Sequence, residues 1–209
     1  MTLESPGSRF YLGIDVGQAR DYSALAVVER RVTLTGVRDP ITFLDHTAAR
    51  IIVSHLERIP LHTSYADVVE CVRAHTQRFQ GRKLEIIMDA TGVGNAFRDM
   101  LVQARLGFNV FGVTLTGGER VAVIPGGYHV PRHDLLANLR ILLEKHMLEI
   151  CLPPRMADLL RTEFLRWGQR SAHDDLIFAV ALGCWKAGGQ SIPLYGSGPM
   201  PFVYPKIRK

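Results

Sequence analysis

The spacing of apolar and polar residues along the chain predicts strands and helices in a definite order. Two apolar runs, residues 10–16 and 84–89, carry almost no polar side chain on either face, which is typical of central strands. Apolar residues three and four apart predict amphipathic helices, and Ser64 is a suitable N-cap for the first helix. The predicted strands are 10–16, 23–31, 42–47, 84–89, 108–113 and 148–152, and the predicted helices are 64–79, 95–106, 131–147, 156–167 and 174–186.

Other segments have a less definite pattern. Residues 50–61 fit either a strand or a short helix. Residues 116–130 are rich in glycine and fit an extended loop or a hairpin. We interpret residues 1–9 as a disordered lead-in, and residues 188–209 as a flexible basic tail rich in proline and glycine.

The order of elements over residues 10–187 indicates one domain with an α/β fold. Three early strands precede helices that alternate with strands, which favours a mixed sheet with helices on its faces. This order is that of the ribonuclease H-like fold, in which helices flank a mixed central sheet. We therefore expect the first strand to be central and the fourth to lie beside it, so that Asp15 and Asp89 project from neighbouring strands.

The composition is that of an ordinary globular protein, with 47% hydrophobic and 22% charged residues among 209. No apolar stretch approaches the roughly 18 residues that a membrane span needs, and the N-terminus lacks the pattern of a secretory signal. Cys71, Cys151 and Cys184 are far apart and odd in number. Their spacing argues against a disulfide framework or a zinc site and favours a reducing cytoplasm.

The charge of the chain favours a polyanionic partner. The formal net charge is +5, and 20 of the 25 basic residues are arginine. Arginine binds phosphate oxygens through a planar, bidentate guanidinium group, although many basic proteins never bind nucleic acid. The candidate phosphate contacts are Arg78, Arg82, Arg120, Arg132 and Arg170, each of which could instead be a solvated surface residue.

A glycine-rich segment over 117–132 contains two of these arginines. Its pairs of glycines bracket a short apolar strand at 121–124, a composition that predicts a mobile hairpin or flap. We expect the flap to gate a DNA groove, with Arg120 or Arg132 reaching a phosphate. An ordinary surface loop is the alternative.

Single carboxylates stand at the ends of the two central strands. Asp15 ends a strand with no other polar side chain, and a charge in such a place is costly unless a cation or several donors satisfy it. Asp89 repeats this pattern, whereas Asp21 fits either an accessory ligand or a turn residue. Gly92 and Gly94 lack the third glycine of a dinucleotide-binding loop, although backbone amides there could hold a DNA phosphate at a helix N-terminus.

A third acidic group opens the last predicted helix. Asp175 shares a face with apolar residues that follow it, whereas Asp174 is rotated by about 100° and is the less direct candidate ligand. His173 could position a water, assist proton transfer or cap the helix. Three carboxylates with few histidines and no paired cysteines favour a hard cation, Mg²⁺ or Mn²⁺. Two such ions about 4 Å apart can support phosphodiester cleavage.

Four segments carry these candidate residues: GIDVG followed by Asp21, IIMDATGVG, YHVPR and HDDLIFAVALGCW. Together they resemble the nuclease domain of the large terminase subunit of tailed bacteriophages, within the ribonuclease H-like nuclease superfamily. The resemblance covers residues 10–186. Carried over by position, the metal-binding catalytic acids are Asp15, Asp89 and Asp175, and the accessory polar positions are Asp21, His173 and Asp174.

The resemblance implies an endonuclease that uses two Mg²⁺ or Mn²⁺ ions to cleave concatemeric double-stranded DNA during viral genome packaging. It would act in the cytoplasm of the infected bacterial host, away from membranes. A terminase ATPase domain, a small terminase subunit and a portal are the implied partners. The ATPase phosphate loop, GxxxxGK[ST], is absent from the sequence, so we expect an excised nuclease domain or a stand-alone relative.

Three alternatives stay open. A Holliday-junction resolvase or another ribonuclease H-like nuclease would share the fold and the metal ions but act on other substrates. Actin-like ATPases and sugar kinases also open with a strand, an Asp and a Gly, but they need two such domains and a longer chain. A DNA-binding module with a degenerate site is the non-enzymatic alternative, which the intact acids make less favourable.

Overall fold

The computed structural model describes residues 7–17, 21–167 and 173–188. The strands are β1 Arg9–Asp15, β2 Ser23–Arg38, β3 Asp45–Ile59, β4 Leu84–Asp89, β5 Asn109–Thr116, β6 Ala122–Ile124, β7 Gly127–Pro131 and β8 Leu148–Ile150. The helices are α1 Tyr65–Gln77, α2 Gly94–Gln103, α3 Arg132–Glu144, α4 Pro154–Arg166 and α5 Asp175–Ala187. The expected lead-in and tail lie almost entirely outside the described residues.

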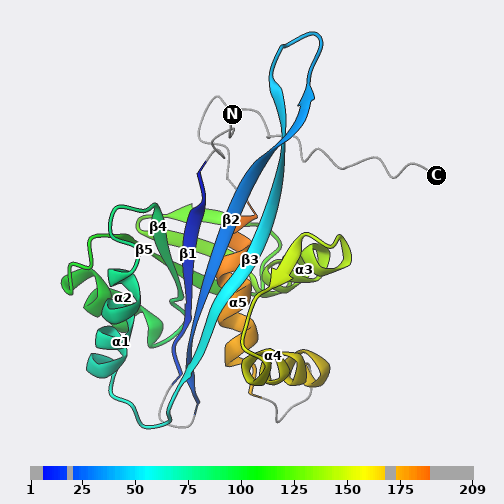
Figure 1. Ribbon diagram of the computed structural model, residues 1–209. Coiled ribbons are helices and arrows are strands. Elements are labelled where there is room, and N and C mark those ends of the chain that lie inside the picture. Colours follow the sequence, from blue (N-terminus) through cyan, green and yellow to red (C-terminus); the bar gives the residue numbers. More distant parts are fainter. Residues whose placement is uncertain (1–6, 18–20, 168–172, 189–209) are drawn as a thin grey trace.

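The strands form one mixed sheet in the order β6-β7-β5-β4-β1-β2-β3-β8 (Figure 1). β1 is central, antiparallel to β2 and parallel to β4, which confirms the predicted neighbours. β4, β5 and β7 all run parallel to β1, so their carboxyl ends meet at one edge of the sheet. That edge brings together the residues that follow each strand.

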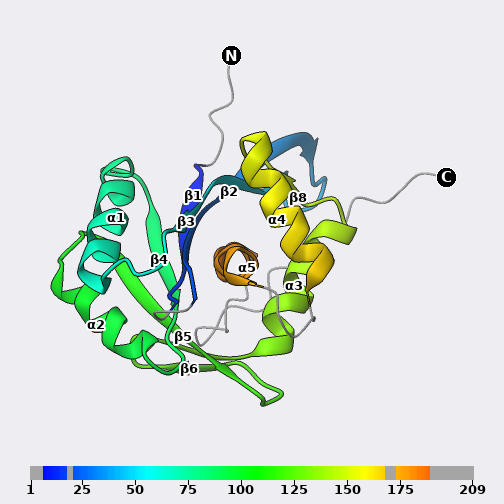
Figure 2. The same ribbon diagram turned by 90° about the horizontal axis from the view of Figure 1, so that it is seen from below.

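The sheet separates two hydrophobic cores. α1 and α2 cover one face, where Val72 and Phe97 pack against sheet residues such as Leu12. The opposite face curls around α5, and α3 and α4 lie outside that helix (Figure 2). Every residue of α5 except Lys186 is buried, which explains its continuous apolar sequence. No helix in the described part of the chain is long and apolar enough to span a membrane.

Two glycines allow α5 to lie directly on the sheet. A Cβ atom at Gly13 of β1 would come within 2.0 Å of the carbonyl oxygen of Ala179. A Cβ atom at Gly183 of α5 would come within 2.6 Å of Val28. Larger residues do not fit where α5 crosses the sheet. The two glycines therefore determine the position of α5 along β1. The first turn of α5 therefore lies at the carboxyl end of β1.

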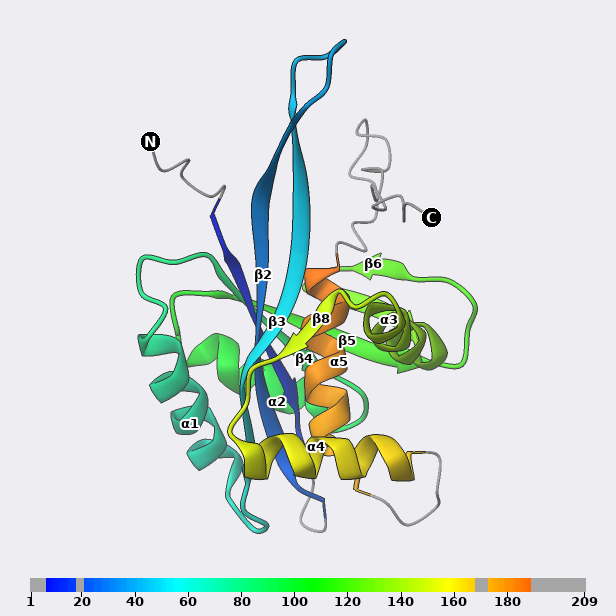
Figure 3. The same ribbon diagram turned by 45° about the vertical axis from the view of Figure 1, so that its right-hand side comes forward.

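β2 and β3 are much longer than predicted. They continue beyond the sheet as a two-stranded arm, which leaves the body at the end opposite the carboxyl ends of β1 and β4 (Figures 1 and 3). The sequence pattern also predicts a turn around Gly36 and Asp39-Pro40. The observed turn includes Asp39 and Pro40 but not Gly36, because Gly36 adopts φ +76° within β2, where the pairing with β3 is irregular. The predicted strand over 42–47 is also wrong in its bounds, because the turn lies near 39–44 and the ambiguous segment 50–61 belongs mostly to β3.

The glycine-rich segment before α3 forms the predicted hairpin, but its second arm belongs to the sheet. β6 pairs with β7, and β7 in turn pairs with β5 over five residues in parallel. Gly127 lies so close to β5 that a Cβ atom there would meet the carbonyl oxygen of Gly112 at 1.9 Å. The expectation of a mobile flap is therefore wrong for β7, because its backbone hydrogen bonds are made with the sheet.

Candidate functional site

A cleft of about 290 Å³ opens at the edge where the parallel strands end. All six acidic and histidine residues predicted from the sequence line it, together with one of the candidate arginines. We call this region the acid cleft, and its charged and histidine lining consists of Asp15, Asp21, Asp89, Arg132, His173, Asp174 and Asp175. The structure thus brings together residues from opposite ends of the chain.

Strand alternation explains why the two strand-end acids face the same side. On β1, Tyr11 and Gly13 point toward α5, and Asp15 follows with the same parity. On β4, Ile87 belongs to the core around α5, and Asp89 lies two residues further along. α5 begins at Asp175 over the same face.

Burial and like charges perturb the Asp15 carboxyl group. Burial raises the pKa of Asp15 well above its ordinary value, and the negative charges of Asp89, Asp175 and Asp174 raise it further. Arg132 opposes this shift. The Asp15 carboxylate is therefore a poorly stabilised anion that a cation would stabilise strongly.

The loop after β4 fixes Asp89 in place. Its Oδ1 atom accepts a hydrogen bond of 2.7 Å from the backbone amide of Thr91. The Thr91 hydroxyl oxygen accepts one of 3.0 Å from the amide of Leu115, which ties the loop to β5. Thr91 and Val93 line the cleft just before α2 begins at Gly94, so backbone N–H groups of the first turn of α2 lie near it.

Asp175 is buried and already has a cationic partner. The Nε atom of Arg58 on β3 donates to Asp175 Oδ2 at 2.8 Å, and Arg58 also forms an ion pair with buried Glu163 of α4. Glu163 Oε2 accepts a hydrogen bond of 3.1 Å from the amide of Ile177, in the first turn of α5. Burial raises the pKa of Asp175, and the charge of Arg58 lowers it. Sequence reasoning missed Arg58 and Glu163.

The remaining polar residues make looser contacts. Asp174 occupies the N-cap position of α5 without a side-chain capping bond to the described residues, and its Oδ2 lies 3.5 Å from Arg132 Nη2. The Arg132 guanidinium stacks over Phe178 at 4.4 Å. His173 packs edge-on against Tyr22 with a centroid distance of 5.1 Å.

The candidate arginines are scattered over the fold. Arg78 follows α1 and Arg82 precedes β4, so both lie toward the end of the sheet opposite the acid cleft. Arg120 lies in the exposed loop between β5 and β6, at the same edge as the cleft, and Arg132 lines the cleft itself. Arg170 lies outside the described residues.

The ligand atoms of the acid cleft are spread out. In the described part of the chain, only His55, Glu57 and His75 bring three ligand atoms within 4.8 Å of one another. The acids of the cleft are all among the described residues, and no three of them bring their ligand atoms within 4.8 Å of one another. They offer carboxylate oxygens along an open surface and do not form a closed cage. The donor set is nevertheless the one that hard divalent cations prefer.

Comparisons with known proteins identify the fold. No protein-family model and no curated protein matches the chain. Among solved structures, the Mn-soaked terminase nuclease domain of human cytomegalovirus is similar with a TM-score of 0.54 and 13% sequence identity, covering 89% of this chain and 87% of that one. The large terminase nuclease from thermophilic phage G20c is similar with a TM-score of 0.49 and 20% identity, covering 85% and 82%. The likeness to the cytomegalovirus domain and the order of strands in the mixed sheet show the ribonuclease H-like α/β fold, as predicted.

Proposed function

We propose that this chain is the nuclease domain of a viral DNA-packaging terminase, a metal-dependent endonuclease that cleaves concatemeric double-stranded DNA. The observation that carries the proposal is the convergence of Asp15, Asp89 and Asp175 from three elements on one cleft. The fold shared with terminase nucleases supports it. By the same proposal, the domain works in the cytoplasm of an infected bacterium, with an ATPase domain, a small terminase subunit and a portal.

The residues of the acid cleft suit Mg²⁺ or Mn²⁺. Asp15, Asp89 and Asp175 would hold the ions, and Asp21, Asp174 and His173 are close enough to assist. The raised pKa of Asp15 reflects a burial of like charges that divalent cations would relieve. Two bound ions would supply a hydroxide nucleophile at neutral pH and stabilise the leaving oxygen.

The residues of the chain itself would position the substrate and the ligands. Thr91 holds Asp89 in one orientation, and Arg58 does the same for Asp175. Arg132 and the N-terminus of α2 face the cleft from two sides, where each can bind a phosphate oxygen of DNA. Arg120 can extend this contact along the duplex from its loop at the same edge. In this proposal, the groups that would bind DNA lie beside the carboxylates.

The test is nicking and linearisation of supercoiled plasmid by the purified chain. We expect cleavage in Mn²⁺ or Mg²⁺ and none in EDTA. Cleavage of linear duplex as rapid as that of a four-way junction would support the terminase assignment, and strong preference for the junction would favour a resolvase. DNA binding without cleavage in either metal would favour the non-enzymatic alternative and overturn the proposal.

A further inference from the structure

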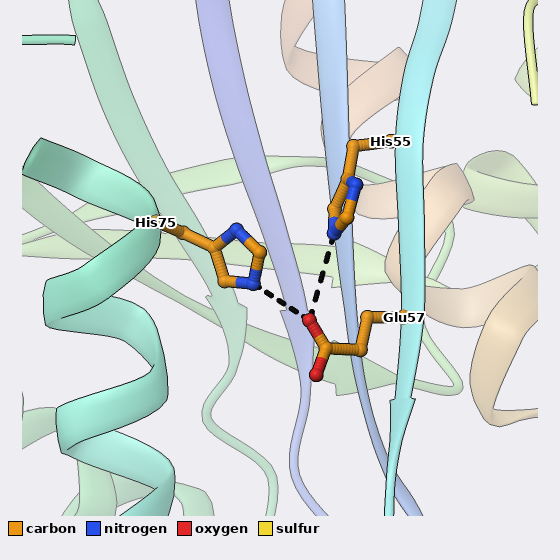
Figure 4. A group of neighbouring side chains, drawn as sticks. All are labelled: His55, Glu57 and His75. Carbon is orange, nitrogen blue, oxygen red and sulfur yellow. Dashed lines mark hydrogen bonds and ion pairs between the residues drawn. The ribbon is translucent and has the colours of Figure 1, made fainter. Parts of the chain in front are cut away.

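A second group of ligand atoms lies on the opposite face of the sheet from α5. His55 and Glu57 project from β3, and His75 projects from α1 toward them (Figure 4). We call these three residues the β3–α1 cluster. Both imidazole rings direct Nε2 at the same carboxylate oxygen, Glu57 Oε2, at 2.7 Å for His75 and 3.5 Å for His55.

Hydrogen bonding within the cluster leaves one nitrogen unsatisfied. His75 makes a normal hydrogen bond to Glu57, but the 3.5 Å contact of His55 is too long for a good one. The Nε2 atom of His55 is shielded from solvent and makes no hydrogen bond with any described residue. A shielded nitrogen that points at a carboxylate oxygen and a second imidazole is placed as a metal ligand would be.

The spacing of the ligand atoms matches a small tetrahedral ion. Zinc binds histidine nitrogen and carboxylate oxygen at about 2.0–2.2 Å, so two ligand atoms in a tetrahedral site lie about 3.4 Å apart. The two contacts of Glu57, at 2.7 and 3.5 Å, bracket that separation. Two imidazoles with one carboxylate favour Zn²⁺ and related transition metals over Mg²⁺, which prefers oxygen ligands alone.

We propose that His55, Glu57 and His75 bind a zinc-class divalent ion that links β3 to α1, at a site separate from the acid cleft. A water completes the coordination. This proposal departs from the sequence expectation of no zinc site. It rested on the absence of paired cysteines, whereas these ligands are histidines and a glutamate on two different elements. The ion acts as a structural link, because its three protein ligands join a strand to the helix packed on it.

The test measures Zn²⁺ binding to the full chain by titration calorimetry and thermal unfolding. We expect the wild type to bind Zn²⁺ and to unfold at a higher temperature when it is bound. His55→Gln should lower the Zn²⁺ affinity at least about tenfold. Loss of a residue that only hydrogen-bonds to a metal ligand already costs about that much, and His55 is proposed as a ligand itself. The matched control is His129→Gln, an exposed histidine on β7, which should leave the affinity unchanged.

A background substitution separates the two candidate metal sites. In Asp89→Asn, Zn²⁺ binding to the β3–α1 cluster should persist, and Co²⁺ bound in its place should give the intense visible absorption of tetrahedral coordination. Zn²⁺ affinity that is lost in Asp89→Asn but unchanged in His55→Gln would place the ion in the acid cleft and overturn the proposal. His75→Gln is a second variant, because His75 is nearly buried and its replacement could prevent folding. His55 is half-exposed, so His55→Gln decides the test if the His75→Gln protein does not fold.

Discussion

In the acid cleft, carboxylates of like charge converge from β1, β4 and α5, whereas in the β3–α1 cluster two imidazoles share one carboxylate. The first arrangement raises the pKa of Asp15, because each additional negative charge there is unfavourable. The second already contains a hydrogen bond of 2.7 Å between His75 and Glu57. Both sets of residues can serve as metal ligands, but only the acid cleft is electrostatically unfavourable on its own.

The ligand atoms are closest together in the β3–α1 cluster, whereas the acid cleft has the greater need for a cation. The β3–α1 cluster is compact, and its His75–Glu57 hydrogen bond forms without an ion, whereas His55 Nε2 has no hydrogen bond to a described residue, so an ion there would mainly add stability. The acid cleft is open, and Arg58 neutralises only one of its acids, Asp175. A mobile divalent ion that arrives with its substrate fits such a site better than a permanent structural one. Variants of both regions test this contrast.

The largest effect is expected from removing an acid of the cleft. Asp89→Asn should lower the rate of plasmid cleavage about 1,000-fold or more, because metal assistance is worth several kcal/mol and each 1.4 kcal/mol is a factor of ten. Its thermal stability in EDTA should not fall, since one of several mutually repelling charges is gone. Cleavage and unfolding temperature are measured on the same preparations. Near-normal cleavage by Asp89→Asn would remove this residue from the site.

The next effect concerns the ion pair that holds Asp175. Arg58→Ala should destabilise the protein by about 3 kcal/mol, because it leaves two buried carboxylates without their cation. Arg140→Ala is the matched control, since Arg140 pairs with Glu144 on the exposed surface of α3 and its removal should leave the unfolding midpoint almost unchanged. Urea unfolding of both variants measures the difference. Equal urea midpoints for the two variants would show that Arg58 does not stabilise the buried carboxylates of Asp175 and Glu163.

A smaller effect is the dependence of stability on pH, which should have opposite signs in the two regions. The folded pKa of Asp15 is raised, so its contribution to stability is full below its ordinary value of 3.8 and is lost as the pH rises through the folded pKa. The folded pKa of His55 is lowered, so its contribution is full above 6.5 and is lost as the pH falls through the folded pKa.

Two variants separate these pH effects. In EDTA, Asp15→Asn should lose the part of the stability that increases toward acid pH, and His55→Gln should lose the part that increases toward pH 7. A folded pKa that differs by 1 from the unfolded pKa changes the free energy of unfolding by about 1.4 kcal/mol. Chemical unfolding is measured from about pH 3.5 to about pH 8 on the wild type and both variants, a range that includes the ordinary pKa values of the Asp15 carboxyl, 3.8, and the His55 imidazole, 6.5. A pH profile of Asp15→Asn that matches the wild type would contradict the electrostatic account of the cleft.

The smallest effect concerns DNA affinity. Arg132 lines the acid cleft, whereas Arg78 lies beside the β3–α1 cluster. Arg132→Ala should weaken duplex binding several-fold and reduce the slope of log affinity against log salt by about 0.9, the value for one phosphate contact. Arg78→Ala should leave both unchanged. If the two variants weaken binding equally, the DNA also covers the opposite end of the sheet.

Local sequence was enough to predict most of the elements and the three places where acids interrupt apolar segments. The run that ends at Asp15 and the one that ends at Asp89 are strands as predicted, and they are neighbours. Ser64 is the N-cap of α1, where its hydroxyl accepts a hydrogen bond from the amide of Asp67. These features are local, because apolar periodicity and capping act within a few residues.

The length of β3, the place of β7 and the partners of the acids depend instead on how the elements pack. The sequence pattern of residues 50–61 fits a strand or a helix, and pairing with the neighbouring strands β2 and β8 makes most of this segment a strand. Arg58 contacts Asp175 across 117 residues of sequence and Glu163 across 105. His75 meets Glu57 only because α1 packs on β3. Such contacts depend on which faces pack together, and a local pattern of residues does not specify the partner across the interface.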